Sequence, residues 1–391
     1  MKILLFGVGM QGKAVLHDLV TSGTVKEIIA ADYDLKSLKN YVQSHGMTSK
    51  VRCEFLDAND SKIIDQLMQE KPDVIIDLLP LQFVDKIAEL AIKNCIHLVN
   101  TNYATPKMRA LAEKAVAQKV TVLPEFGLDP GIDLVLLGEA IHSFDQIHSI
   151  RSYGAGLPDP TCADNPIKYK VTWTLEGVLR SYYRPACLLR EGKVIEIDRK
   201  DIFKEENVHE IEINGLGPLE AYPSGDATIY LDKIGSKAST LQEMGRYTLR
   251  YPGHCAFWKK IVDLHLLDDE PVILEGMEIN RRQFLATAIE PHIALKEDER
   301  DIALVRVEMT GVRDQKKRKM SFQVLDKRDL RTGLTAMNRT VGFTVSVGAQ
   351  LIGEKKLKKP GLLSPVEDIP FNILEDELSK RGVEITKEVT D

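Results

Sequence analysis

Three glycines near the start of the chain form the pattern with the clearest chemical meaning. The run Gly7-Val8-Gly9-Met10-Gln11-Gly12 follows the apolar segment Ile3–Phe6 and opens a helical pattern. In that setting the first glycine permits a tight turn, the second lets the backbone approach a pyrophosphate, and the third lets the helix lie close to its strand. The helix N-terminus would offer unpaired N–H groups and a partial positive charge to the phosphates. We therefore expect a dinucleotide site whose contacts come from Gly7, Val8, Gly9, Met10, Gln11 and Gly12.

A carboxylate follows twenty residues after Gly12, at Asp32. An aspartate at the end of the second strand can accept hydrogen bonds from the adenosine ribose hydroxyls, and it would repel a 2′-phosphate. The alternative is that Asp32 or Asp34 only caps the next helix, and Asp34 is better placed to do so. The sequence therefore predicts NAD as the cofactor in preference to NADP.

Polar and turn-forming residues at the ends of later strands are further candidates to line the cofactor cleft. A purely structural role in turns is an equal alternative for them. These residues are Asp57, Leu79, Pro80, Thr101, Asn102 and Gly127.

Short apolar runs alternate with helical patterns over the first third of the chain. The runs predict buried parallel strands at Ile3–Phe6, Glu27–Ala31, Val51–Phe55, Val74–Leu78, His97–Val99 and Thr121–Leu123. Apolar residues three or four apart predict helices at Gln11–Thr21, Leu35–His45, Lys62–Glu70, Val84–Asn94 and Lys107–Gln118. This order of elements indicates an α/β Rossmann domain with helices on both faces of a parallel sheet.

The alternation stops after the helical stretch Ile132–His142, and irregularly connected strands follow. We expect them at Ile147–Tyr153, Tyr169–Trp173, Lys193–Ile197, Tyr247–Tyr251, Ala303–Thr310 and Lys319–Leu325. They predict a second α/β domain on a mixed or antiparallel sheet. Ala336–Leu351 returns to a helical pattern with small residues that would allow close packing on the first domain. The predicted division is a Rossmann domain over 1–130, joined by returning helices of 335–391, and a second domain over 131–334.

Length and composition limit the classes of function. A chain of 391 residues is long enough for two domains, and a net charge of −6 argues against a nucleic-acid partner. Its apolar runs are far shorter than the ~20 residues of a membrane span, and the N-terminus does not read as a secretory signal. Five scattered cysteines indicate reduced thiols, and the isolated histidines give no metal site. We expect a cytoplasmic protein that binds a small molecule.

Several longer motifs resemble the saccharopine dehydrogenase family. They are Glu125–Gly131, Gly154–Pro158, Asn165-Pro166, Tyr169–Trp173 and Thr248–His254. Within that family the chain is similar to lysine 6-dehydrogenases through Leu175-Glu176-Gly177 and Gly217–Ala221, whereas Asp129 in its GLDPG motif looks more like saccharopine reductases. The resemblance implies that the second domain binds substrate and forms a homodimer. It also implies lysine metabolism, with oxidation at the ε-carbon of lysine or of a lysine-derived secondary amine such as saccharopine.

Such an oxidation needs groups that hold the amino acid and accept a proton. Arg250 is the first candidate to bind the substrate α-carboxylate, and a surface ion pair is its alternative. Asp129 could bind a substrate ammonium, or it could simply form a turn. Tyr169 or Lys170 is the candidate base, one of which should face solvent on an alternating strand, with His254 next. Trp173 would be an apolar wall or a core residue, and Thr101 and Thr248 are further substrate-binding candidates.

The residues therefore predict an NAD-dependent dehydrogenase that acts on CH–NH or CH–NH2 donors. One alternative is the reverse chemistry, the reductive condensation of an aldehyde with an amine, as in saccharopine reductases or carboxynorspermidine-type enzymes. Another is a non-catalytic protein that senses NAD.

Overall fold

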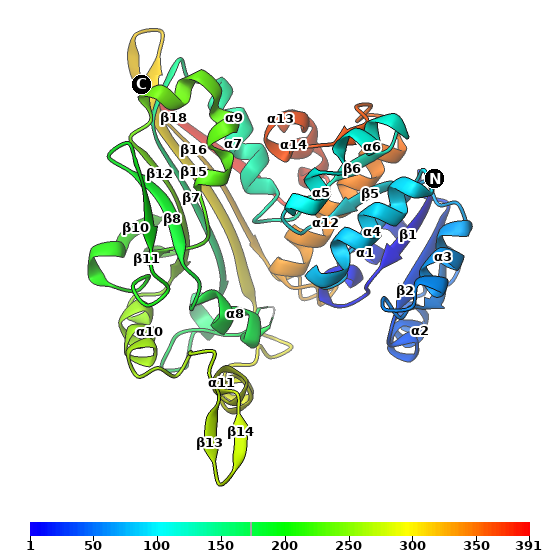
Figure 1. Ribbon diagram of the computed structural model, residues 1–391, viewed down its shortest axis with the longest axis horizontal. Coiled ribbons are helices and arrows are strands. Elements are labelled where there is room, and N and C mark those ends of the chain that lie inside the picture. Colours follow the sequence, from blue (N-terminus) through cyan, green and yellow to red (C-terminus); the bar gives the residue numbers. More distant parts are fainter. Residues whose placement is uncertain (173) are drawn as a thin grey trace. The chain divides into compact units, whose positions relative to one another are not determined.

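A computed structural model describes residues 1–172 and 174–391 (Figure 1). The chain folds into two compact units. The first unit comprises Met1–Glu139 and Asn338–Glu384, and the second comprises Ala140–Met337 and Ile385–Asp391. Within the described residues, no helix combines the length and apolar character needed to cross a bilayer.

The first unit is built on a seven-stranded parallel sheet. Its strand order is β17-β6-β5-β4-β1-β2-β3, with the order reversing beside β1 as in a dinucleotide-binding fold. The predicted Rossmann architecture is confirmed. The strands are β1 (Lys2–Phe6), β2 (Glu27–Asp32), β3 (Val51–Phe55), β4 (Val74–Asp77), β5 (His97–Asn100), β6 (Thr121–Leu123) and β17 (Gly361–Leu362).

Helices connect these strands and cover the sheet. Asp34 and Asp60 cap α2 and α3 by accepting hydrogen bonds from the Ser37 and Lys62 amides. The single helix predicted over 107–118 is two short helices, α5 and α6. The helices are α1 (Met10–Thr21), α2 (Leu35–Ser44), α3 (Ser61–Gln69), α4 (Leu81–Lys93), α5 (Pro106–Arg109), α6 (Ala112–Ala117), α7 (Ile132–His142), α12 (Ala336–Gly353), α13 (Pro365–Asp368) and α14 (Phe371–Ser379).

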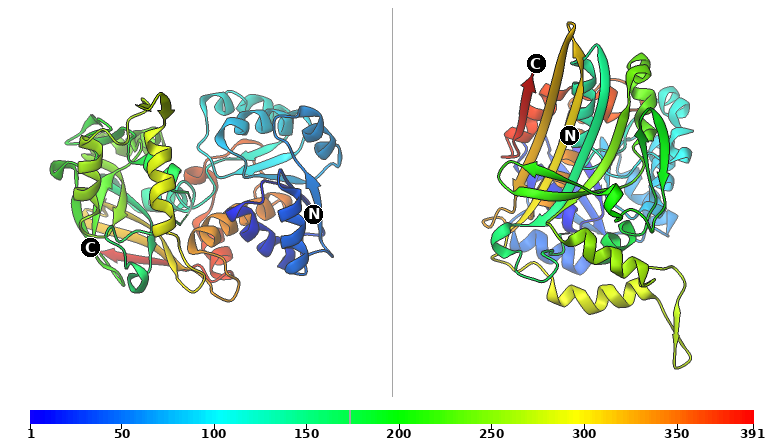
Figure 2. Two further views of the ribbon diagram at one scale, coloured as in Figure 1. Left: turned by 90° about the horizontal axis from the view of Figure 1, so that it is seen from below. Right: turned by 90° about the vertical axis from the view of Figure 1, so that its left-hand side faces the viewer.

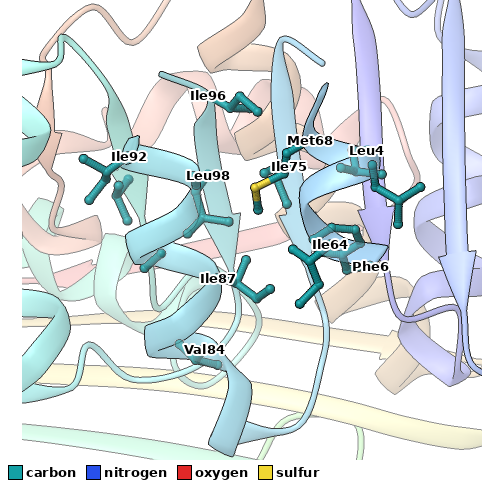
Figure 3. Close-up of a cluster of buried hydrophobic side chains, with 14 of the residues drawn as sticks. Leu4, Phe6, Ile64, Met68, Ile75, Val84, Ile87, Ile92, Ile96 and Leu98 are labelled. Atoms are coloured by element: carbon teal, nitrogen blue, oxygen red, sulfur yellow. The ribbon is translucent and has the colours of Figure 1, made fainter. Parts of the chain in front are cut away.

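One face of this sheet packs against α3 and α4 through a fully apolar cluster (Figure 3). Leu4, Phe6 and Ile75 come from the central strands, and Ile64 and Ile87 come from the helices. All five are completely buried, and each contributes roughly 1.5–3 kcal/mol relative to an exposed side chain. This packing holds rigid the strand ends from which the glycine-rich loop departs.

Helix α12 lies against α1, the helix that opens at the glycine-rich loop. A Cβ atom at Gly342 would come within 2.7 Å of the Ala14 side chain, so a glycine is needed for this approach. On the same helix pair, the buried Asp18 carboxylate accepts hydrogen bonds from Ser346 Oγ at 2.6 Å and from Gln350 Nε2 at 3.0 Å. Arg381 adds a bidentate ion pair to Asp18 at 2.6 and 3.1 Å. Segments distant in sequence therefore fix the position of α1.

The second unit contains a nine-stranded mixed sheet. Its main path is β10-β11-β12-β7-β15-β16-β18, with β8 paired to β12 and β9 paired to β8. The prediction of a mixed sheet is confirmed. The strands are β7 (Gln146–Pro158), β8 (Ala186–Arg190), β9 (Lys193–Ile197), β10 (His209–Ile213), β11 (Gly217–Pro223), β12 (Glu243–Arg250), β15 (Asp301–Arg313), β16 (Lys316–Lys327) and β18 (Ile385–Thr390).

Two expectations for the second unit were wrong. Residues 169–172 do not form a strand, and only an isolated bridge joins Val171 to Ala294. The end of the chain is not a returning helix but β18, which pairs with β16. Ile385, Thr386, Val389 and Thr390 are β-branched, and such residues favour strands over helices.

Helices and one small hairpin complete the second unit. The two-stranded hairpin β13–β14 projects from the body of this unit, as the right-hand view of Figure 2 shows. A cluster of aromatic and aliphatic side chains, which includes Tyr182 and Trp258, joins α8 and α10 to β8 and β11. The remaining elements are α8 (Leu175–Ser181), α9 (Leu231–Ile234), α10 (His254–Asp263), α11 (Arg281–Ile289), β13 (Val272–Leu274) and β14 (Met277–Ile279).

We expect Asp18→Ala to destabilise the first unit by about 2 kcal/mol, because it leaves Ser346 Oγ and Gln350 Nε2 without their buried acceptor and Arg381 with Glu377 as its remaining ion-pair partner. Urea denaturation would measure the free energy of unfolding. The exposed helical Asp65→Ala is the control and should change that energy by less than about 0.5 kcal/mol. Equal stability of the two variants would contradict the role of Asp18.

Candidate active site

The glycine-rich loop has the geometry of a phosphate cradle. Gly7 has a φ of +86°, and a Cβ there would lie 2.9 Å from the Leu78 carbonyl oxygen. A Cβ at Gly12 would lie 2.4 Å from the Gly7 carbonyl oxygen. The fold itself therefore requires these two glycines.

Gly9 differs from its two neighbours. Around a Cβ placed there, no atom of the described residues lies within 4 Å, so the fold leaves this space open. Gly9 is the N-cap of α1, and Met10 and Gln11 form the first turn of that helix. A pyrophosphate fits beside the first turn, where helix amides and the helix dipole attract anions.

Asp32 is tied to the protein backbone. Its Oδ2 accepts a hydrogen bond from the Val8 amide at 2.6 Å, and its Oδ1 accepts one from the Asp34 amide at 2.9 Å. The carboxylate thus fastens the end of β2 to the glycine-rich loop. Sequence reasoning offered ribose binding or helix capping, and the structure shows a third role, because Asp34 is the residue that caps α2.

The other predicted cofactor residues lie at the carboxyl ends of β3 to β6, the edge at which such sheets bind ligands. Asp57 accepts a hydrogen bond from the Asn59 amide in a local turn. Leu79 donates its amide to Asp77, and Pro80 precedes α4. A Cβ at Gly127 would come within 3.4 Å of the Thr101 side chain, so these two residues are neighbours.

Two polar residues at the same edge escaped the sequence analysis. Asp77 and Asn100 are completely buried register partners at the ends of β4 and β5. Asp77 Oδ2 and Asn100 Nδ2 have no hydrogen-bond partner among the described residues, and burial raises the pKa of Asp77 to about 7. The sequence held a signal for them, because each is a polar residue that directly follows buried apolar residues at the end of a short strand, in Val-Ile-Ile-Asp and His-Leu-Val-Asn.

Asp129 lies on the turn between β6 and α7. Its side chain is exposed, and its peptide bond to Pro130 is cis. The turn closes through a hydrogen bond from the Gly127 amide to the Pro130 carbonyl at 2.9 Å. The predicted turn is therefore present, with the Asp129 side chain on its exposed side.

In the second unit, Arg250 ends β12 and is only 5% exposed. Its Nε donates to the Tyr182 hydroxyl at 3.2 Å, and its Nη1 donates to the Leu249 carbonyl at 2.8 Å. The Tyr169 ring centroid lies 5.0 Å from the guanidinium carbon, which favours the cation through its π-face. The alternative of a surface ion pair is wrong, because the guanidinium is buried and no carboxylate of the described residues pairs with it.

That arrangement leaves hydrogen-bond donors of Arg250 unused. A guanidinium carries five N–H groups and stays charged in proteins. Within the described part of the chain, Nη2 donates to no acceptor. Two adjacent N–H groups in a fixed plane suit a carboxylate, which they can bind in bidentate fashion.

His254 is the first residue of α10 and lies beside Arg250. Its Nε2 is 2.9 Å from the Tyr182 hydroxyl. Burial and the neighbouring charge of Arg250 lower the pKa of His254 well below its usual value. The ring is therefore neutral at pH 7, with Nε2 engaged by Tyr182.

Tyr169 and Lys170 are both buried, so the expectation that one faces solvent was wrong. The reason is that their segment is an irregular turn, held by Asn165, which bonds to the Tyr169 amide at 3.2 Å and to its carbonyl at 2.7 Å. Strand alternation therefore does not apply.

The two side chains differ in what they can do. Burial opposes the charge of Lys170, but hydrogen bonds to Glu299 and Asp164 outweigh it and raise the pKa of Lys170. A lysine held protonated in this way does not act as a base near neutral pH. Burial raises the pKa of the Tyr169 phenol, and its hydroxyl has no partner among the described residues.

Two further candidates concern the same region. Thr248 is half-buried two residues before Arg250 on β12, and side chains at that spacing share a face of the sheet. Trp173 lies outside the described residues. The described histidines, cysteines and carboxylates form no cluster that could hold a metal ion.

Both parts of the chain match models of known protein families. Residues 3–123 match the family model of the saccharopine dehydrogenase NADP binding domain, and residues 127–383 match that of the saccharopine dehydrogenase C-terminal domain. A saccharopine dehydrogenase (NADP(+), L-glutamate-forming) of Schizosaccharomyces pombe is 27% identical, with coverage of 86% of this chain and 88% of the relative. The Saccharomyces cerevisiae protein of the same name is 26% identical, and 97% of each chain is covered.

The fold also has a solved counterpart. The apo, histidine-tagged L-Glu-forming saccharopine dehydrogenase of Saccharomyces cerevisiae matches with a TM-score of 0.87 and 24% identity over 100% of both chains. This likeness shows that the two proteins share a fold.

The prediction of NAD as the preferred cofactor was wrong. The family model that matches residues 3–123 describes an NADP binding domain, and the two fungal relatives carry NADP(+) in their names. The prediction rested on Asp32 as the residue that would bind the ribose hydroxyls and repel a 2′-phosphate. Both Asp32 oxygens accept backbone N–H groups, from Val8 in the loop and from Asp34, so an aspartate at this position has a structural role and is not by itself a sign of NAD.

The expected family resemblance and the oxidoreductase class are confirmed. Because its two family models together extend over nearly the whole sequence, this chain belongs to the saccharopine dehydrogenase family.

Proposed function

We propose that this protein is an NADP-dependent dehydrogenase that oxidises the carbon–nitrogen bond of saccharopine. The two fungal relatives are named for the formation of L-glutamate. In that reaction the ε-carbon of the lysine part loses a hydride and the secondary nitrogen loses its proton to give an imine, which water then cleaves to an aldehyde and glutamate. When bound, NADP+ supplies the hydride acceptor.

The observation that carries this proposal is the buried Arg250 guanidinium with unused donors. Saccharopine is an amino acid with carboxylates on both sides of its nitrogen, and lysine has only one carboxylate. A buried cation without a protein counter-charge is costly, so a ligand carboxylate would stabilise it. Arg250 would hold one substrate carboxylate, and Thr248, on the same face of β12, could hydrogen-bond to it.

Other residues take supporting roles in this proposal. Asp129 is our candidate to bind the substrate amine, because its carboxylate is exposed beside the cofactor edge of the first unit. Tyr169 would donate its free hydroxyl hydrogen to the substrate, since its raised pKa keeps it neutral. The glycine-rich loop would hold the pyrophosphate of NADP+. A homodimer stays a prediction, which light scattering in solution would test.

The proposed activity is tested by mixing the protein with saccharopine or lysine, each with NADP+ or NAD+, and following the nicotinamide absorbance. We expect turnover with saccharopine and NADP+, and none with lysine. Turnover of lysine alone would contradict the substrate assignment. Absence of turnover with every pair, alongside tight NADPH binding, would contradict the enzymatic function.

We expect Gly9→Ala to raise the Kd for NADPH about tenfold or more, because the added methyl group would occupy the space that the pyrophosphate needs. The fold leaves that space open, so the Tm should stay within about 2 °C of the parent. Fluorescence titration with NADPH measures the Kd. Gly23→Ala, at another open position, is the control; a Gly9→Ala variant that binds NADPH as well as this control would remove the loop from the cofactor site.

We expect Arg250→Lys to raise the KM for saccharopine roughly 100-fold with a smaller change in kcat, because a lysine cannot reproduce the two parallel hydrogen bonds of the guanidinium. Steady-state kinetics at saturating NADP+ provides the measurement. Arg313→Lys, on an exposed end of β15, is the matched control and should leave the KM unchanged. A normal KM in the Arg250 variant would exclude this residue from substrate binding.

A further inference from the structure

The hydroxyl of Tyr182 lies between Arg250 and His254. Tyr182 follows the last residue of α8 and is completely buried. Its oxygen is 3.2 Å from Arg250 Nε and 2.9 Å from His254 Nε2. The three side chains come from the C-cap of α8, from β12 and from α10, so the contact joins segments that are distant in sequence.

One direction of the hydrogen bonds around the Tyr182 hydroxyl gives every donor and acceptor there a partner. Arg250 Nε–H can only donate, so the Tyr182 oxygen accepts from it. Tyr182 then has its own proton to give, and the neutral His254 ring accepts that proton's hydrogen bond at Nε2. We assign the tautomer from this network: with Nε2 as the acceptor, the ring proton is on Nδ1, and the ring also has a hydrogen bond to the Ile167 backbone. The order from Arg250 to Tyr182 to His254 leaves each of these atoms with a partner.

This chain of bonds fixes the plane of the guanidinium. Tyr182 holds the Nε edge, the Leu249 carbonyl holds Nη1, and the Tyr169 ring lies 5.0 Å from the central carbon. Nη2 is the nitrogen that these contacts leave free. An arginine side chain otherwise has many rotamers, and holding one of them in advance reduces the entropy lost when a ligand binds.

We propose that Tyr182 is a positioning residue, which with His254 orients the Arg250 guanidinium so that Nη2 faces the substrate carboxylate. This inference rests on the proposed function of Arg250. It goes further in assigning roles to a tyrosine hydroxyl and a histidine that are not expected to touch the substrate. His254, a candidate base by sequence, acts here as the acceptor that holds the tyrosine proton.

A purely structural role for Tyr182 predicts something different. Its ring packs against Phe203, Tyr222 and Trp258, with ring centroids 4.9 to 6.0 Å apart. Phenylalanine keeps this packing and removes only the hydroxyl. A structural role would therefore show as a changed Tm, whereas the positioning role would show in the KM.

We expect Tyr182→Phe to raise the KM for saccharopine roughly tenfold, because the variant loses about one hydrogen bond to a charged group. The kcat should stay within about twofold of the parent. Tyr222→Phe is the matched control, because Tyr222 is equally buried in the same cluster and its hydroxyl makes no hydrogen bond to Arg250. The control should leave the KM unchanged. Thermal unfolding of both variants measures any effect on the fold.

His254 provides a second, independent variant pair. In His254→Gln the side-chain amide oxygen can still accept from Tyr182, so the KM should stay within about threefold of the parent. In His254→Leu no acceptor remains, and the KM should rise roughly tenfold, as in Tyr182→Phe. A lower KM in His254→Gln than in His254→Leu is a result that packing alone would not produce.

The results separate this inference from the proposed function. If Arg250→Lys raises the KM but Tyr182→Phe behaves like Tyr222→Phe, the positioning role is overturned and the carboxylate site stands. Equal KM values for His254→Gln and His254→Leu would overturn the role of His254 in the same way. If Arg250→Lys itself leaves the KM unchanged, both the carboxylate site and the positioning role are overturned.

Discussion

A guanidinium buried without a carboxylate partner among the described residues is the constraint on which the substrate-binding half of this protein depends. Arg250 is 5% exposed, stays charged, and is held by a tyrosine hydroxyl, a backbone carbonyl and an aromatic face. Neutral dipoles and a π-face can make such a charge tolerable, but they do not neutralise it. The surrounding residues therefore prepare a site for an anion, and an amino-acid substrate provides one.

The cofactor half depends on a different constraint, the close approach of backbone to backbone. Gly7 and Gly12 are required because a Cβ would collide with neighbouring carbonyls, whereas Gly9 leaves room for a ligand. Asp32 fastens this loop to β2, and Asp18 fastens α1 to α12 and Arg381. In both cases a carboxylate holds the phosphate-binding loop and its helix in place. An aspartate after β2 can therefore have this structural role, which is why its presence did not distinguish NAD from NADP.

Patterns of apolar residues and glycines along the sequence predicted well those elements that form from neighbouring residues. The strands and the glycine-rich loop of the first unit follow from apolar runs and glycine spacing, and β3, β6 and α7 begin and end at the predicted residues. Arg250 was found by its motif, but the burial that makes it chemically distinctive depends on α8 and α10, which no periodicity placed beside it. Lys170 and Tyr169 were misjudged because their segment is an irregular turn. Tyr182 was missed because a tyrosine just after a helix can equally be a core residue, and only the fold brings its hydroxyl between Arg250 and His254.

The central claim is that Arg250 receives a carboxylate of the substrate. A crystal structure of the complex with NADPH and saccharopine tests it most directly. The proposed function predicts a saccharopine carboxylate within hydrogen-bond distance of Arg250 Nη2, about 2.7–2.9 Å, with the Tyr182 hydroxyl still bonded to Nε. A complex in which every saccharopine carboxylate binds elsewhere, while Arg250 keeps its present contacts, would contradict it.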